Sequence, residues 1–426
     1  MTPTPGVRRI VVLANRLPFP LDDGWNVRTF HVLRAMARLA DTTLLVFEPD
    51  DASVVDAARA ALGVPLRVRT VPRPRLHTLR RAALGAITSS PVHVWTQESA
   101  AFHRAFREEL ERAPVDVVLT EATFFERYLR EAPSAALKVV DTHNIDSLQM
   151  RRNAQHDRVP LRRWYAGMTV PKLEALENRV YAAADLTWVC SDDEVRAITR
   201  RVPDAHVVCA PNGVDTDALV PDQAHAPVAD RLVFFGRLDY FPNVDAMTYM
   251  VEEILPRILR LRPQAKLRVI GSGDRSEVDR IVAGNPAVEV IGRVPDVRPE
   301  VGQAAVVVVP LRSGGGTRLK ILEAMSMARP VVSTSIGAEG IELANGRDAL
   351  LVDDADAFAS AVARLLADPA EGERIGAAGR RLVIDRDDWK SLGERLAADV
   401  LALAAERASS PAPAVRVSAR NPSPAL

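Results

Sequence analysis

The sequence has only two cysteines, no net charge and no long apolar run. Two cysteines exclude a disulfide framework and a cysteine-rich metal site. Lysine plus arginine and aspartate plus glutamate each number 55, so no overall charge favours nucleic acid as a partner. No apolar run approaches the roughly 18 residues of a membrane-spanning helix, and the first residues lack the apolar core of a signal peptide. We therefore expect a cytoplasmic protein that binds no nucleic acid.

The chain is too long for one ordinary hydrophobic core. Its 426 residues predict two domains, and 47% hydrophobic with 26% charged residues is typical of a globular protein. Strand and helix patterns alternate in both halves, and residues 216–230 between them lose hydrophobic periodicity. This alternation predicts an α/β fold built from two Rossmann-like halves with parallel sheets. Neither half has the GxGxxG fingerprint of a dinucleotide-binding protein.

Residues 306–330 carry the clearest chemical signal. Val306–Val309 suits a buried parallel strand, and three glycines then precede an amphipathic helix. A helix N-terminus after a glycine turn offers backbone N–H groups to an anion, and Arg318 and Lys320 add positive charge there. Glu323 lies one turn past Lys320, where a carboxylate suits the hydroxyls of a ribose better than a phosphate. We interpret this stretch as a cradle for a nucleotide sugar.

Several other predicted strands end in polar residues or glycines. In open parallel sheets, ligands bind beyond this carboxyl edge. His143 follows a strand within a polar cluster, which favours a functional role over a structural one. Gly24 lies in the loop after the first strand, where a plain turn and a close approach to a ligand both stay open. The same reasoning places further residues at this edge, namely Gly236, Arg237, Gly271 and Val294.

Four motifs, in their order and spacing, resemble the family-4 retaining glycosyltransferases of the GT-B fold. They are VVCAPNGVD at 207–215, FFGRLDY at 234–240, the glycine cradle ending in ILEAM at 321–325, and RPVVSTSIGAEG at 329–340. The resemblance covers most of residues 8–400 and is to the branch that builds bacterial exopolysaccharide and related cell-surface glycans. It implies transfer of a sugar from a UDP- or GDP-sugar to a hydroxyl of a glycan or lipid-linked acceptor. No metal or other cofactor is expected, and the glycine cradle has no Asp-x-Asp that would hold one.

The resemblance also implies a division of the chain. Residues 1–220 would bind the acceptor, and residues 221–386 would bind the nucleotide sugar. A helix at 387–407 would pack back toward the first domain. The Pro-, Ser- and Ala-rich composition of residues 408–426 predicts a disordered tail.

The family's functional residues carry over unevenly. The resemblance implies that Glu323 holds the donor ribose, but the family's first paired glutamate is replaced here by Gly315. A lysine that often follows the phosphate-binding arginine is absent, and Arg318 or Lys320 would replace its charge. The residues expected to act in catalysis are His143, Arg237 and Lys320. Those expected to bind the donor are Gly24, Gly236, Gly271, Val294, Gly314, Gly315, Gly316, Thr317, Arg318, Leu319 and Glu323.

Two questions stay open from the sequence. Because Gly315 replaces a glutamate, the chain could be a GT-B protein that binds nucleotide sugar or glycan without transferring it. A sugar-nucleotide epimerase ranks behind both readings, since the cradle is poor in the carboxylates that elimination needs. The basic cluster Arg67–Arg81 has no acidic residue and fits either a solvated face or a peripheral contact with the inner face of a membrane.

Overall fold

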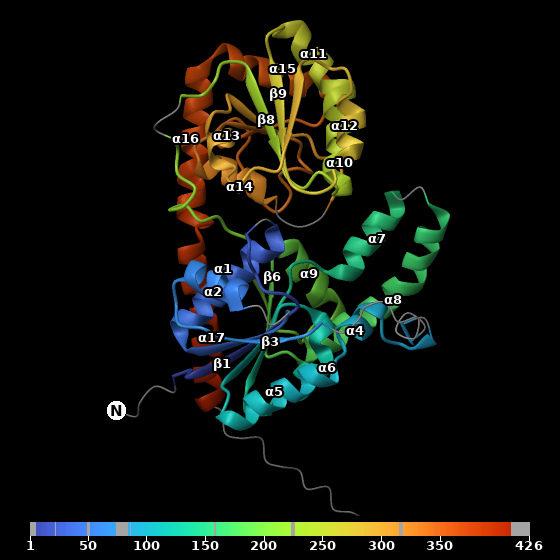
Figure 1. The fold of residues 1–426 in the computed structure, drawn as a ribbon, viewed down its shortest axis with the longest axis vertical. Helices are drawn as coiled ribbons and strands as arrows, with labels where there is room; N and C mark the ends of the chain where they lie inside the picture. The colour runs from blue at the N-terminus through green and yellow to red at the C-terminus, as the bar shows by residue number, and fades with distance from the viewer. Residues whose placement is uncertain are drawn as a thin grey trace, which may run out of the picture.

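The computed structural model describes residues 6–21, 23–48, 52–73, 84–85, 87–156, 159–222, 226–314 and 318–409. Two parallel β-sheets, one in each half, are flanked by helices (Figure 1). Seven strands form the N-terminal sheet in the order β3-β2-β1-β4-β5-β6-β7, and six form the C-terminal sheet in the order β10-β9-β8-β11-β12-β13. The predicted α/β fold with two Rossmann-like halves is confirmed.

The N-terminal sheet is buried on both faces, as expected for β-branched strands connected by helices. Its strands are β1 (Arg9–Ala14), β2 (Asp41–Phe47), β3 (Arg67–Val71), β4 (Val117–Thr120), β5 (Leu137–Asp141), β6 (Leu186–Val189) and β7 (Val207–Cys209). Its helices are α1 (Gly24–Leu39), α2 (Ala52–Leu62), α4 (Val92–Gln97), α5 (Ala100–Arg112), η1 (Thr123–Phe125), α6 (Glu126–Leu129), α7 (Asp146–His156), α8 (Pro160–Ala183) and α9 (Asp192–Arg201).

The C-terminal sheet has β11 at its centre, and all four valines of that strand are fully buried. The strands are β8 (Arg231–Phe235), β9 (Lys266–Ile270), β10 (Val288–Gly292), β11 (Val306–Val309), β12 (Val331–Ser333) and β13 (Leu350–Leu351). The helices are α10 (Phe241–Tyr249), η2 (Met250–Ile254), α11 (Leu255–Leu261), α12 (Ser276–Val282), α13 (Arg298–Gly302), α14 (Leu319–Ser326), α15 (Ala355–Ala367), α16 (Pro369–Arg386) and α17 (Trp389–Ser409).

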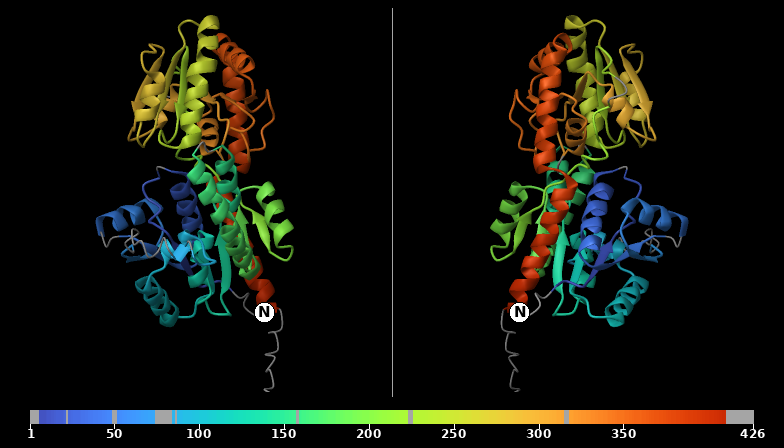
Figure 2. Two further views of the ribbon diagram at one scale, coloured as in Figure 1. Left: turned by 90° about the vertical axis from the view of Figure 1, so that its right-hand side faces the viewer. Right: turned by 90° about the vertical axis from the view of Figure 1, so that its left-hand side faces the viewer.

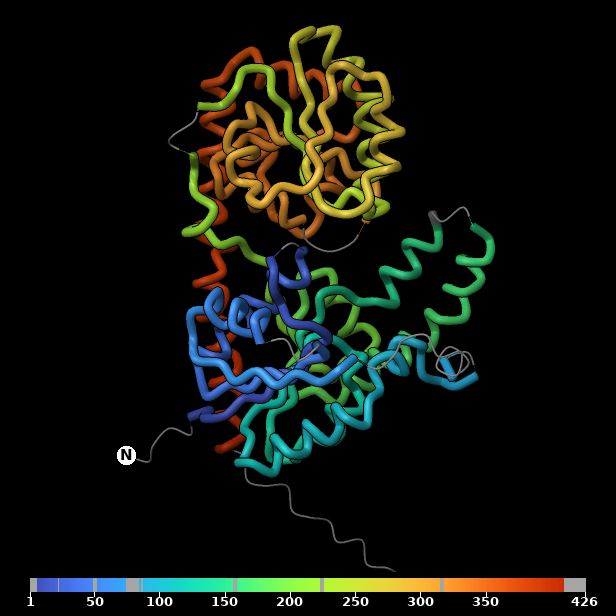
Figure 3. Tube along the Cα trace, viewed as in Figure 1, coloured from blue at the N-terminus to red at the C-terminus, as the bar shows by residue number. Residues whose placement is uncertain are grey.

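The chain passes between the halves twice, and the two crossings are hydrogen-bonded to each other (Figure 3). The backbone N–H of Val214 donates to the carbonyl of Asp387 at 2.8 Å, and that of Trp389 donates to the carbonyl of Val214 at 3.0 Å. Beyond the second crossing, α17 runs along the N-terminal half and packs on α1 (Figure 2). The domain boundary at residue 220 stays a prediction, and the tail from residue 410 lies outside the described residues.

Candidate functional site

A cavity of about 550 Å³ lies between the carboxyl ends of the two sheets. Residues of the N-terminal half form one wall, and residues after β8, after β11 and on α14 form the other. The residues lining it from the N-terminal half are Arg16, Leu21, Asp23, Gly24, Trp25, Val27, His143, Asn144, Gln149 and Asn212. Those from the C-terminal half are Phe235, Gly236, Arg237, Asp239, Tyr240, Pro242, Asn243, Leu311, Arg318, Leu319, Lys320 and Glu323.

The first turn of α14 brings a cation and a carboxylate to this cavity. Lys320 Nζ donates to Asn243 Oδ1 at 2.9 Å and lies 4.2 Å from the ring centre of Phe234. Burial, with the nearby Arg318 cation, lowers the pKa of Lys320 to about 7. Burial raises the pKa of Glu323 to about 7 as well. Both groups therefore titrate near neutral pH, and an anion in the cavity would favour the ammonium form of Lys320.

The turn after β8 places Arg237 beside α14. Asp239 accepts two hydrogen bonds from Arg237, at 3.0 Å from Nε and 2.7 Å from Nη2, and these bonds lower the pKa of Asp239. Gly236 has a φ of 147°, and a Cβ atom there would lie 2.9 Å from Lys320 Nζ. Only glycine fits this position without displacing Lys320. The glycine directly after β8 thus leaves room for Arg237 and Lys320 to line the same wall.

On the opposite wall, His143 lies within a stack of planar groups. Its ring stacks on Trp25 with 5.4 Å between ring centres, and the Arg16 guanidinium lies 4.7 Å from the ring centre of Trp25. Thr29 Oγ1 lies 3.4 Å from His143 Nε2 and donates to Glu121 Oε2 at 3.1 Å. Burial lowers the pKa of His143 to about 4, so its imidazole is neutral at pH 7. It can exchange hydrogen bonds there but adds no positive charge.

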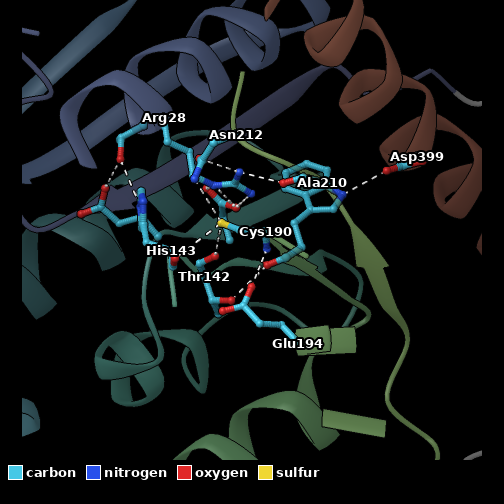
Figure 4. A network of polar contacts seen from close by, with 12 residues as sticks. Arg28, Thr142, His143, Cys190, Glu194, Ala210, Asn212 and Asp399 are labelled. Carbon is cyan, nitrogen blue, oxygen red and sulfur yellow. Dashed lines mark hydrogen bonds and ion pairs between the residues drawn. The ribbon is translucent and has the colours of Figure 1, made fainter. Parts of the chain in front are cut away.

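A buried ion pair between Arg28 and Asp141 adjoins this wall, and Arg28 is labelled in the polar network of Figure 4. Arg28 on α1 contacts both carboxylate oxygens of Asp141, at 3.0 Å from Nε to each and at 2.5 Å from Nη2 to one of them. Arg28 Nη1 also donates to the carbonyl of Ala210 at 2.8 Å and to Asn212 Oδ1 at 3.2 Å. Because Asn212 lines the cavity, this network joins the end of β5, the helix α1 and the first crossing. Both charged side chains are only 1% exposed.

The structure brings most of the predicted site residues together. His143, Arg237 and Lys320 line one cavity, and so do Gly24, Gly236, Arg318, Leu319 and Glu323.

The remaining predicted residues are placed elsewhere. Gly271 and Val294 do not line this cavity. A Cβ atom on Gly271 would lie 1.7 Å from the carbonyl oxygen of Gly236, so this glycine serves chain packing, while Val294 packs on the C-terminal core. Gly314 is described but is not among the lining residues. Gly315, Gly316 and Thr317 lie outside the described residues.

Sequence reasoning missed part of the N-terminal wall. Arg16 and Trp25 lie in a loop and first turn that gave no chemical signal. The sequence offered one clue to Arg28: this charged residue follows Val27 and stands one helical turn before Val32 in what is now α1. Among the described residues, no group of three or more His, Cys, Asp or Glu side chains could hold a metal ion.

The described part of the Arg67–Arg81 cluster is paired with protein groups. Arg67 and Arg69 both contact Glu109 of α5, at 3.2 and 3.4 Å, and Arg73 donates to Asn15 Oδ1 at 2.9 Å. The other three arginines of the cluster lie outside the described residues. A membrane contact through this cluster stays a prediction. No helix in the described ranges is both long and apolar enough to span a bilayer.

Comparison with known proteins adds a family to this geometry. Residues 229–368, which include β8, β11 and most of the cavity's second wall, match the family model described as Glycosyl transferases group 1. The chain carries a group 1 glycosyl transferase domain. The match does not cover the N-terminal wall, which includes His143.

Curated proteins that match part of this chain include enzymes from mycobacteria. The chain is 31% identical over 252 residues to the GDP-mannose-dependent alpha-(1-6)-phosphatidylinositol monomannoside mannosyltransferase of Mycolicibacterium smegmatis. That alignment covers 54% of this chain and 65% of the relative. A glycogen synthase of Mycobacterium tuberculosis is 26% identical, over 56% of this chain and 59% of its own. The matched region thus spans less than two thirds of either relative.

Solved structures match over nearly the whole chain. A sucrose-phosphate synthase of Thermosynechococcus elongatus superposes with a TM-score of 0.70 at 19% identity, covering 94% of this chain and 100% of its own. The Anabaena protein HepE, in complex with UDP and glucose, superposes with a TM-score of 0.62 at 13% identity, covering 92% and 98%. At these identities the likeness shows the fold, which is GT-B.

Proposed function

We propose that this chain moves a sugar from a nucleoside diphosphate sugar to an acceptor hydroxyl, with retention of anomeric configuration. Its role would be in the synthesis of a cell-surface polysaccharide or glycoconjugate. One observation carries the proposal: Arg237, Lys320 and Glu323 face His143 across a single cavity between two sheet edges. Cations bind a diphosphate, a carboxylate accepts hydrogen bonds from the ribose hydroxyls, and neutral donors and acceptors bind a sugar.

The cations account for the departure of the diphosphate. As the glycosidic C–O bond breaks, negative charge develops on the leaving oxygen. Arg237, Arg318 and Lys320 line the wall where that charge would lie, and cations fixed in advance stabilise it without reorganisation. Glu323, one turn further along α14, would accept hydrogen bonds from the ribose hydroxyls.

The opposite wall suits the sugar. Neutral His143 and the amides Asn144 and Asn212 offer donors and acceptors without charge. Among the cavity's carboxylates, Asp23 is paired with Arg16 at 2.6 Å and Asp239 with Arg237. This pairing supports attack by the acceptor hydroxyl from the leaving-group face, with its proton passing to the diphosphate oxygen.

Two donors should be tested first. The mannosyltransferase relative is named for GDP-mannose, and the HepE structure holds UDP and glucose. We infer a UDP- or GDP-hexose donor for this chain. The lipid-linked acceptor in the relative's name supports a lipid-linked or glycan acceptor here.

The test incubates the purified chain with GDP-mannose or UDP-glucose and measures both binding and sugar release. Calorimetric titration gives binding, and chromatography of GDP or UDP gives hydrolysis or transfer. Glu323→Leu, which keeps the side chain's volume but removes its carboxylate, serves as the paired variant. Release of nucleoside diphosphate by the wild type and its loss in the variant support the transferase. Donor binding without any release would favour a protein that binds nucleotide sugar and transfers nothing.

A further inference from the structure

The first turns of α8 expose large apolar side chains. Leu161, Trp164, Tyr165 and Met168 are 70%, 61%, 42% and 41% exposed. They follow the spacing i, i+3, i+4, i+7, so they share one face of the helix. Single exposed apolar side chains are common on protein surfaces, but a contiguous apolar stripe that includes a tryptophan marks an interaction surface.

This stripe stands away from the body of the molecule. The pair α7 and α8, packed side by side, projects beside the gap between the two sheets (Figure 1). Ile87, which is 81% exposed, belongs to the segment that Lys172 of α8 holds through a 2.8 Å hydrogen bond from Nζ to the carbonyl of Gly85. We call α7 and α8 together the arm. Because it projects, the arm can contact a flat surface without a steric clash between that surface and the rest of the chain.

The charges on the arm indicate which kind of partner surface its apolar stripe would contact. Residues 159–173 hold two arginines and one lysine but no acidic residue. Arg162 and Arg163 stand between Leu161 and Trp164 in the sequence, and both side chains are exposed. At 3.6 residues per turn, Arg162 flanks the stripe and Arg163 lies on the opposite face of α8. A helix with an apolar stripe that includes Trp164 and Tyr165, and with arginines beside and opposite that stripe, fits the boundary between acyl chains and anionic headgroups.

The geometry points to the N-terminal turns of α8 as a docking surface for an anionic lipid bilayer. Leu161, Trp164 and Met168 would enter the headgroup region while Arg162, at the edge of the stripe, lies at the phosphates. This inference does not depend on the transferase activity. It differs from the contact predicted at Arg67–Arg81, whose described arginines are occupied by Glu108, Glu109 and Asn15.

The arm also leads toward the cavity. Tyr165 borders a groove of about 420 Å³ under α7 and α8, and Gln149 borders both this groove and the main cavity. If the proposed function holds, a bilayer at the arm places a lipid-linked acceptor within reach of the cavity along this groove.

Flotation of the full-length chain with lipid vesicles tests the docking surface. Vesicles of phosphatidylcholine with one third phosphatidylglycerol are compared with vesicles of phosphatidylcholine alone. We expect flotation with the anionic vesicles and a fall in binding of about tenfold in Leu161→Ser/Trp164→Ser. Leu261→Ser is the matched control, because Leu261 is 55% exposed at the end of α11 in the other half. Arg162→Gln should weaken anionic-vesicle binding more than Arg200→Gln, which removes an exposed arginine of α9.

Three results would overturn the inference. They are absence of wild-type flotation with anionic vesicles, equal flotation of the double variant, and an equal effect of Leu261→Ser. A dimer in light scattering that the double variant abolishes would instead assign the stripe to a contact between copies. Circular dichroism of each variant checks the fold. Sugar release from donor in vesicle-free buffer should be unchanged in the double variant, so failure of the docking surface and of the transferase are distinguishable.

Discussion

Gly24, the first residue of α1, faces Leu319, the first residue of α14, across the cavity. A Cβ atom on Gly24 would lie 3.1 Å from Cδ1 of Leu319. A second contact between the halves joins Arg152 of α7 to Glu339 at 3.6 Å. The two halves lie close together at Gly24, where the N-terminal wall has no side chain.

We predict that Gly24→Val lowers kcat/KM for sugar transfer by at least about tenfold. The branched side chain would push Leu319 and α14 away from the N-terminal wall and separate the cations from the sugar. Gly24→Ala should have a much smaller effect, because the terminal atom of Leu319 can move by a few tenths of an ångström. Gly167→Val is the control, since a Cβ atom at Gly167 meets no atom within 4 Å. Equal steady-state kinetics for Gly24→Val and the wild type would contradict this role.

Both Rossmann-like halves were predictable, because hydrophobic periodicity directly reports parallel strands and covering helices. The valines of β11 and the stripe on α14 are local signals of this kind. Details set by tertiary packing were not predictable. Helix α5 begins at Ala100 with Ser99 as its cap, and a π-helical turn at Met250–Ile254 separates α10 from α11.

Lys320 provides a pH-dependent prediction. Its pKa in the free protein is about 7, so at pH 8 most molecules carry a neutral amine there. A bound diphosphate favours the ammonium form and raises this pKa, so donor binding takes up a proton and the affinity falls as the pH rises above 7. Glu323 cannot release a proton at pH 8, because a carboxyl with a pKa of about 7 is already ionised in the free protein, and any uptake by this carboxyl would persist when Lys320 is replaced.

Calorimetric titration of GDP or UDP at pH 8, in two buffers of different ionisation enthalpy, measures this uptake. We expect the wild type to take up about one proton per ligand bound and Lys320→Met to take up much less. The same proton uptake in both proteins would assign it to another group. Proton release by the wild type would reverse the predicted sign.

The buried pair of Arg28 and Asp141 makes a prediction about stability. Asp141→Asn leaves the guanidinium of Arg28 buried without a countercharge, and we expect unfolding of the N-terminal half to become easier by about 3–5 kcal/mol. Urea unfolding, followed by tryptophan fluorescence, to which the buried Trp188 of the same half contributes, measures this change. Asp279→Asn, which breaks an exposed pair with Arg275, should leave the unfolding midpoint almost unchanged. Equal midpoints for the two variants would show that the buried pair is dispensable.

The site was predictable where its chemistry is contiguous in sequence and much less so where distant segments meet. Lys320 and Glu323 are three residues apart, so spacing alone places them on one face of α14, and Arg318 immediately precedes that helix. The stack of Arg16, Trp25 and His143 joins the loop after β1 to the loop after β5, and only the fold brings them together. Gly271 shows the reverse case. Its position after a strand suggested a ligand site, but in the structure its lack of a side chain lets it pack against the backbone of Gly236.

The central claim is that the cations of the C-terminal wall bind a nucleoside diphosphate, and calorimetric titration of Arg237→Ala against Arg293→Ala with GDP and UDP tests it most directly. Both arginines follow strands of the same sheet, but only Arg237 lines the cavity. The account predicts that Arg237→Ala weakens the binding of one of these nucleotides by at least about tenfold, as expected for the loss of a charge-assisted hydrogen bond, while Arg293→Ala binds like the wild type. Wild-type affinity in Arg237→Ala, or no binding of either nucleotide by the wild type, would contradict it.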